Sequence, residues 1–241
     1  MWPFRKKQML AESGFFCGFI DWHSHILPDV DDGVQTMEEA LQVLTEYEKL
    51  GVKEVWLTPH IMEDIPNTTG KLRERFAELR SAYQGPVVLN LASENMLDNL
   101  FEERLKRNDL LPIGRNGDHL LIETSYFNPP MGLQNILMRI KTKGYYPVLA
   151  HPERYVYMEE TEYRQLKTMG VKFQLNLPSL ANMYTIDVRK KAGWLLKNDL
   201  YDFVGSDLHR LTIWKEKIFN KQISENTLRM LRGILTALFP E

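Results

Sequence analysis

The sequence has almost no cysteine, no excess of basic residues and no long apolar run. Cys17 is the single cysteine in 241 residues, so no disulfide forms within the chain and no thiolate cluster holds a metal ion. Lys and Arg total 30 against 32 Asp and Glu, which gives no support for a nucleic-acid-binding protein. A reducing compartment, the cytoplasm, is the simplest interpretation of the cysteine count.

No apolar stretch is long enough for a signal peptide or a membrane-spanning helix. The first seven residues, Met-Trp-Pro-Phe-Arg-Lys-Lys, are basic and aromatic. We expect a frayed tail there, with a weak contact to an anionic membrane surface or a partner as the alternative. The sequence thus predicts no stable membrane insertion, an N-terminal extension over residues 1–19 and one large domain over residues 20–241.

Short apolar runs alternate with longer amphipathic segments, a pattern typical of repeated βα units around a mainly parallel sheet. We predict strands at residues 19–20, 54–57, 87–91, 119–122, 146–149, 172–175 and 202–204. We predict helices near residues 36–50, 69–83, 97–106, 133–143, 163–169, 188–196 and 224–238. Seven such units predict an α/β fold, a distorted (β/α)7 barrel that is one unit short of a TIM barrel.

Five of the six histidines lie at or just past the ends of these predicted strands. His23 and His25 are two residues apart, as are Asp207 and His209, and this spacing places strand side chains on one side. In such barrels the C-terminal rim carries the active site. The metal ligands that we expect at this rim are His23, His25, His60, Glu94, Glu123, His151, Asp207 and His209. His119 begins a strand on the opposite rim and is expected to be structural.

Eight imidazole and carboxylate ligands are too many for one ion, so we expect two or three ions. Glu94 and Glu123 are the candidates for bridging ligands, although a glutamate after a strand also commonly begins a helix or forms an ion pair. Ligands of this kind without cysteine favour manganese or iron, with zinc possible. Metal clusters of this type activate water for an in-line displacement, and phosphate ester hydrolysis is their commonest use.

Two further residues are candidates for catalysis. Asp32 belongs to an acidic turn, residues 29–33, where it would act as an acid or orient water beside the ions; otherwise the turn is a solvated loop that caps the next helix. Arg154 follows His151 by three residues, and its guanidinium matches two phosphate oxygens. The alternative for Arg154 is a surface ion pair with Glu153.

Four motifs of the chain occur together in a known family: Asp21-Trp22-His23-Ser24-His25, Asp29-Val30-Asp31-Asp32-Gly33, Ala150-His151-Pro152-Glu153-Arg154-Tyr155 and Ser206-Asp207-Leu208-His209. They resemble the polymerase and histidinol phosphatase (PHP) superfamily, and more closely its bacterial manganese-dependent tyrosine-protein phosphatases of capsular and exopolysaccharide operons. The resemblance runs from about Ile20 to the end of the chain. It implies a distorted seven-stranded barrel with three metal ions, glutamate ligands at Glu94 and Glu123, and the second-strand histidine at His60.

The resemblance also implies hydrolysis of phosphotyrosine, typically on the tail of a partner tyrosine autokinase. Members often carry a second arginine shortly after the final histidine, where this chain offers Arg210 or Lys215. One alternative is a small-molecule phosphatase such as a histidinol-phosphate phosphatase, which a deep, closed pocket would favour over the open rim that suits a peptide. The other is a non-catalytic metal-bound module, against which the complete ligand set argues.

Overall fold

The computed structural model describes residues 7–181 and 183–237, so the expectation for the basic tail lies, except at Lys7, outside the described residues. Six parallel strands form one sheet in the order β10-β9-β8-β7-β6-β4, and three form a second in the order β2-β3-β5. The first sheet contains β4 (His60–Ile61), β6 (Glu94–Met96), β7 (His119–Glu123), β8 (Tyr146–Ala150), β9 (Lys172–Asn176) and β10 (Phe203–Gly205). The second contains β2 (Ile20–Ser24), β3 (Glu54–Leu57) and β5 (Val88–Leu91).

The predicted second and third strands form as β3 and β5, but each is followed by a further short strand that belongs to the other sheet. β3 ends at Leu57 and the chain resumes as β4 at His60, after a proline that has no N–H to give to a ladder. β5 likewise gives way to β6, which begins at Glu94. An isolated parallel bridge between Ser24 and Leu208 joins the end of β2 to the segment after β10. The result is an α/β fold whose parallel strands curl in the manner of a TIM barrel.

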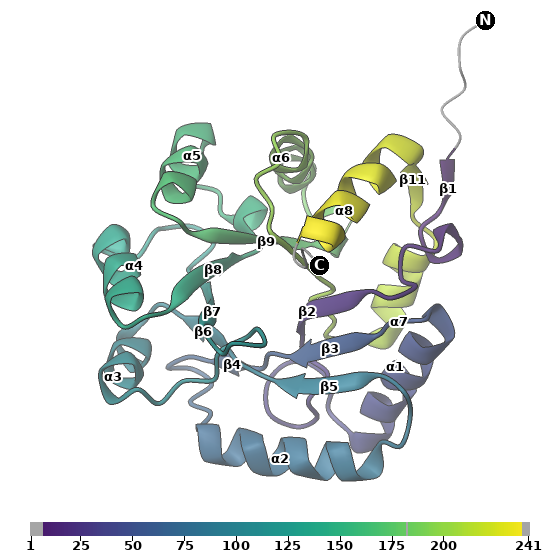
Figure 1. The fold of residues 1–241 in the computed structure, drawn as a ribbon, viewed down its shortest axis with the longest axis horizontal. Helices are drawn as coiled ribbons and strands as arrows, with labels where there is room; N and C mark the ends of the chain where they lie inside the picture. Colours follow the sequence, from purple (N-terminus) through teal and green to yellow (C-terminus); the bar gives the residue numbers. More distant parts are fainter. Residues whose placement is uncertain (1–6, 182, 238–241) are drawn as a thin grey trace, which may run out of the picture.

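Helices surround the curled sheets, with α1 to α6 spread around their outer side (Figure 1). The α-helices of the described residues are α1 (Met37–Leu50), α2 (Thr69–Ala82), α3 (Asn99–Arg107), α4 (Leu133–Thr142), α5 (Glu160–Thr168), α6 (Ile186–Lys197), α7 (Leu211–Trp214) and α8 (Glu225–Ala237). α1 begins as predicted, because the Thr36 side chain accepts a hydrogen bond from the N–H of Glu39. α5 begins earlier than predicted because Glu159 and Glu162 form a capping box.

A small antiparallel pair, β1 (Lys7–Met9) with β11 (Gln222–Ser224), was not predicted. Because β11 ends at Ser224, the last helix begins at Glu225. Phe15, Phe16 and Phe19 follow β1 and are buried, and the Phe16 ring lies 5.6 Å from the ring of Trp214. Residues 10–19 therefore contribute to the same hydrophobic core as the strands. Among the described residues, no helix combines the length and the hydropathy that a membrane crossing requires.

A second buried cluster is built mainly from strand residues of both sheets, including Trp22, Trp56, Leu121, Val148 and Phe203. The Trp22 and Trp56 rings are stacked at 5.8 Å between centroids. Because its members come from β2, β3, β7, β8 and β10, this cluster packs the two sheets against each other. The strand ends that carry the histidines and carboxylates are thereby fixed with respect to one another.

Candidate metal centre

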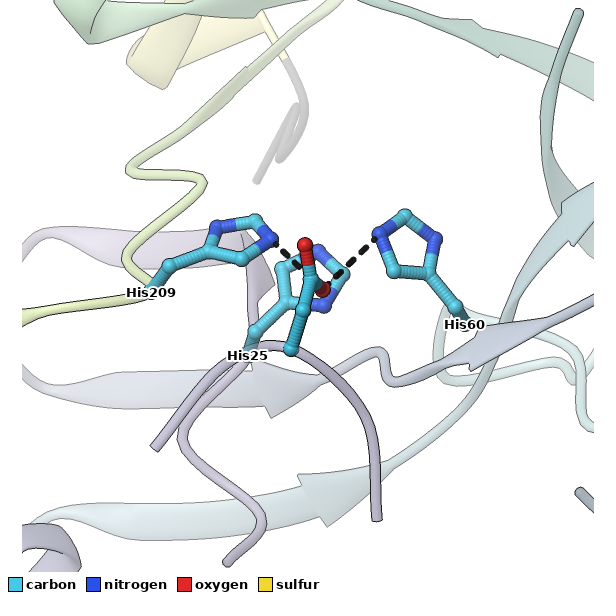
Figure 2. A group of neighbouring side chains, drawn as sticks. His25, His60 and His209 are labelled. Atoms are coloured by element: carbon cyan, nitrogen blue, oxygen red, sulfur yellow. Dashed lines mark ion pairs between the residues drawn. The ribbon is translucent and has the colours of Figure 1, made fainter. Parts of the chain in front are cut away.

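The eight predicted ligands lie together at the C-terminal ends of the parallel strands. Together with Asp32, they form four overlapping groups whose donor atoms lie within 4.8 Å of one another: His25, Asp32, His60 and His209; His23, His25 and Asp207; His23, Glu94 and His151; and His60, Glu94 and Glu123. Figure 2 shows the rings of His25, His60 and His209 converging from three separate segments of the chain. Residues far apart in sequence are therefore brought to one point.

Glu94 is the centre of this arrangement. One of its carboxylate oxygens lies 3.2 Å from His23 Nε2 and 3.1 Å from His60 Nδ1, and the other lies 3.0 Å from His151 Nε2. Glu94 thus belongs to two of the four groups, as a carboxylate that bridges two ions must. Glu123 belongs to one group, in which its Oε1 lies 2.9 Å from His60 Nδ1.

The hydrogen bonds of His23 and His25 fix which ring nitrogens face inward. His23 Nδ1 lies 2.8 Å from Gln174 Oε1, and His25 Nδ1 lies 2.7 Å from Asp31 Oδ2. Both partners are acceptors, so each Nδ1 is the donor, and each neutral ring carries its lone pair on Nε2. These two Nε2 atoms are only 3.0 Å apart. Two facing lone pairs at this distance repel unless a cation or a proton lies beside them.

Three buried atoms of the ligand residues have no hydrogen-bond partner within the described part of the chain: His60 Nδ1, Glu123 Oε1 and His151 Nδ1. Unpartnered buried polar atoms are costly and uncommon. His60 Nδ1 and Glu123 Oε1 lie 2.9 Å apart, but they are not aligned for a hydrogen bond. Together with the facing His23 and His25 nitrogens, they show that the residues fit a cluster of cations.

The two carboxylate oxygens of Asp207 have different neighbours. One faces the ligand cluster and the other faces the neighbouring pocket. Oδ1 lies 3.5 Å from His23 Nε2 and 3.4 Å from His209 Nδ1. Oδ2 accepts hydrogen bonds from Arg154 Nη1 at 3.1 Å and from Asn176 Nδ2 at 2.6 Å. One carboxylate therefore connects the histidines to an arginine.

The backbone is strained where two of the candidate ligands lie. His151 and Asp207 adopt left-handed φ angles of 35° and 48°, which costs about 1–3 kcal/mol for each non-glycine residue. The N–H of Asp207 donates to the carbonyl of His23 at 2.8 Å. Next to it, Gly205 leaves no room for a side chain, because a Cβ there would lie 2.5 Å from His23 Cβ. The close approach of β10 and β2 thus holds Asp207 in its unusual conformation.

Burial and the facing carboxylates act against each other on the imidazoles. Burial lowers the pKa of His23, but Glu94 and Asp207 outweigh it and raise this pKa to about 9. Burial likewise opposes a larger effect of Glu94 and Glu123, which raises the pKa of His60 to about 10. The hydrogen bond from His209 lowers the pKa of Asp32 to about 2. Asp32 is therefore ionised at neutral pH, which suits a ligand or a water-orienting group better than an acid.

A pocket of about 460 Å³ lies beside the ligands and is lined by, among others, Tyr126, Arg154, Met183, Tyr184, Ile213 and Trp214. Arg154 does not pair with Glu153, which is buried and accepts hydrogen bonds from the Tyr201 hydroxyl and the Asn176 N–H. Arg210 also lines the pocket. Lys215 instead forms an ion pair with Glu46 at 2.8 Å, so Arg210 is the better placed of the two for a second phosphate contact.

Sequence reasoning missed five residues around the ligands: Asp31, Tyr126, Gln174, Asn176 and Tyr184. Gln174 and Asn176 left a signal, because they are polar side chains two apart that alternate with the apolar Phe173 and Leu175 at the end of a strand. Asp31 was in the acidic turn, but nothing distinguished it from Asp32. No pattern marked the two tyrosines. His119, expected to be structural, forms a hydrogen bond with Asp118 at 2.6 Å and packs on Tyr146.

Comparison with known proteins agrees with this geometry. The model of a family described as capsular polysaccharide synthesis, CpsB/CapC, matches residues 19–222. The tyrosine-protein phosphatase CpsB of Streptococcus pneumoniae is 34% identical over 209 residues, which cover 80% of this chain and 83% of the relative. The tyrosine-protein phosphatase YwqE of Bacillus subtilis (strain 168) is 26% identical over 80% of this chain and 78% of the relative.

Solved structures show the same fold. A chain from the crystal structures of YwqE from Bacillus subtilis and CpsB from Streptococcus pneumoniae, described as metal-dependent tyrosine phosphatases, superposes with a TM-score of 0.75. It is 24% identical, and the match covers 92% of this chain and 88% of the other. The lactonase Lmo2620 from Listeria monocytogenes superposes with a TM-score of 0.55 at 12% identity, over 94% of this chain and 87% of the other.

Proposed function

This chain belongs to the capsular polysaccharide synthesis CpsB/CapC family, and we propose that it is a metal-dependent protein-tyrosine phosphatase. The observation that carries this proposal is the position of Arg154, which lines the pocket and is hydrogen-bonded to the candidate ligand Asp207. A phosphate group in this pocket would contact the guanidinium on one side and the ligand cluster on the other. The names of the relatives identify tyrosine phosphate as the substrate group.

We propose that His23, His25, His60, Glu94, Glu123, His151, Asp207 and His209 hold two or three ions, with Asp32 beside them. Manganese is the metal we favour, since the ligands are imidazole and carboxylate without thiolate, and iron or zinc remain alternatives. Bound ions of this type lower the pKa of water and stabilise the charge that develops on phosphate oxygens. The hydrogen bonds of Gln174 and Asp31 orient His23 and His25 for this role.

The pocket supports an aromatic substrate group that is attached to a peptide. Ile213 and Trp214 give it apolar walls, against which a phenyl ring would pack. Met183 and Ile213 are 36% and 40% exposed at its edge, so the pocket opens toward solvent. This open pocket favours a protein substrate over a small molecule. Hydrolysis of a small molecule such as histidinol phosphate is the second candidate function.

Other features belong to the same proposal. We infer that the two parallel sheets form one distorted seven-stranded barrel, supported by the bridge between Ser24 and Leu208 and by the buried cluster that both sheets share. We infer a cytoplasmic location, which the single cysteine supports. The phosphorylated partner that we propose is a tyrosine autokinase of capsular or exopolysaccharide synthesis, supported by the family description.

Metal binding should become tighter as the pH rises toward about 9. In metal-free protein His23 and His209, each with a pKa raised to about 9, and His60, with a pKa raised to about 10, are protonated at pH 7. An ion binds only neutral imidazole, so each of these protons must leave on loading. Calorimetric titration with manganese in buffers of different ionisation enthalpy measures this release. Affinity that does not change between pH 6 and 9 would contradict the protonation states proposed for this site.

The proposed activity is tested with metal-free protein to which manganese, iron or zinc is returned. We expect the loaded protein to hydrolyse a tyrosine-phosphorylated peptide with a higher kcat/KM than histidinol phosphate, because the apolar walls contact the phenyl ring and the open rim admits the peptide. A preference for histidinol phosphate would replace the proposal by its runner-up. No hydrolysis of either compound with any of the metals would support a non-catalytic module.

A further inference from the structure

We propose that Tyr126 and Tyr184 are positioning residues that hold the Arg154 guanidinium ready for phosphate, and we call the three side chains the arginine clamp. The Cζ atom of Arg154 lies 4.3 Å from the ring centroid of Tyr126 and 4.6 Å from that of Tyr184. A guanidinium over an aromatic ring is attracted by the electron density of the ring face. All three residues line the pocket. The proposal rests on the phosphatase function proposed above.

Asn176 ties the clamp to the ligand cluster. Its side-chain amide donates to Asp207 Oδ2 at 2.6 Å and to the Tyr184 hydroxyl at 3.2 Å. The same Asp207 oxygen accepts the hydrogen bond from Arg154 Nη1. Arg154 is therefore held along its edge by Asp207 and against its face by the tyrosines, while Asn176 fixes the position of one tyrosine relative to that carboxylate.

This arrangement reduces the cost of binding phosphate. A long arginine side chain loses rotamer freedom when a ligand fixes it, and one that is already held loses less. The cationic site is also prepared before charge develops on the phosphate oxygens, which is how fixed charges stabilise a transition state. The clamp should thus strengthen both the binding of phosphate and the stabilisation of the transition state, and both effects should depend on Arg154.

Replacing either ring by leucine should keep the fold and the metal content. The carbonyl of Tyr126 accepts a hydrogen bond from the N–H of Val156 at 2.8 Å, so the backbone holds this loop against the next. Both tyrosines are half-buried, and Tyr126 also packs against the core, with its ring centroid 5.8 Å from that of His151. Leucine keeps an apolar side chain at each position, and thermal unfolding and elemental analysis check the fold and the metal content of each variant.

The test is a double-mutant cycle. Tyr126→Leu and Tyr184→Leu should each lower kcat/KM for a phosphotyrosine peptide and weaken the binding of inorganic phosphate, measured by calorimetry, by roughly 3- to 30-fold. Tyr126→Phe should recover most of the loss, because the ring face returns. Tyr184→Phe should recover less, because the bond from Asn176 is missing. Tyr146→Leu is the matched control, since that half-exposed ring packs on His119 away from the pocket.

The decisive comparison is made in the Arg154→Ala background, where both leucine substitutions should have little further effect. Leucine effects of the same size with and without Arg154 would overturn the clamp, because the rings would then contact the substrate directly or act only on the fold. The phosphate measurement does not require turnover. Coupled phosphate binding in a protein that hydrolyses no phosphomonoester would therefore support the clamp and reject the proposed function, whereas wild-type protein that binds no phosphate would overturn both.

Discussion

Replacing His23, His25 or Asp207 by alanine is expected to abolish nearly all phosphatase activity and to lower the metal content. Each side chain belongs to a group of donors that lie within 4.8 Å of one another, so its loss leaves the remaining donors of that group with an incomplete site. Even residues that only orient metal ligands cost 10- to 100-fold when they are lost, so we expect a fall of at least about 100-fold in kcat/KM. Phosphotyrosine peptide assays and elemental analysis of each variant measure this.

His119→Ala is the matched control for these variants. It removes an imidazole that interacts with Asp118 and Tyr146 at the start of β7, away from the ligand cluster. Its activity and metal content should stay close to those of the unaltered protein. Full activity in two of the three ligand variants would refute the assignment of the site.

Arg154→Ala should keep the fold and the metals but lose transition-state stabilisation. A charge-assisted hydrogen bond to phosphate is worth about 1.5–3 kcal/mol, which corresponds to a fall of about 10- to 150-fold in kcat/KM. Inhibition by inorganic phosphate should weaken as well, because the same guanidinium would hold the product. Arg154→Lys should recover only part of the activity, since an ammonium cannot make the two-pronged contact.

Arg164→Ala controls for the loss of a stacked arginine in general. Arg164 lies over the Trp194 ring at 5.3 Å and donates to Asn198, outside the residues that line the pocket. We expect its removal to leave kcat/KM unchanged. Normal kcat/KM and normal phosphate inhibition in Arg154→Ala would show that Arg154 only pairs with Asp207, and would leave Arg210 as the candidate for phosphate binding.

Much of this site could be predicted because parallel strands end at one edge. Residues such as His23, Glu123 and His151 follow buried apolar runs, and the βα pattern is enough to place such ends together. The seven predicted runs correspond to β2, β3, β5, β7, β8, β9 and β10. What the pattern could not show are the short strands β4 and β6, which begin at His60 and Glu94, because strands of two and three residues have no periodicity to detect.

The side chains that orient the ligands were harder to predict, since their roles depend on tertiary contacts. Asp31 and Asp32 are neighbours in one acidic turn, yet Asp31 accepts a hydrogen bond from His25 while Asp32 lies close to His209. Tyr126 and Tyr184 are 58 positions apart by their numbers in the sequence and meet only at Arg154. A single sequence contains no signal that joins such pairs.

The number of metal ions bound per chain tests the central claim most directly. Protein purified without chelator and supplied with manganese, iron and zinc should contain two or three ions per chain by elemental analysis, because the donors form four overlapping groups that share Glu94, His23, His25 and His60. The phosphotyrosine phosphatase activity of the same samples should rise with this occupancy. One ion or fewer per chain, with all three metals available, would contradict a metal cluster at this site.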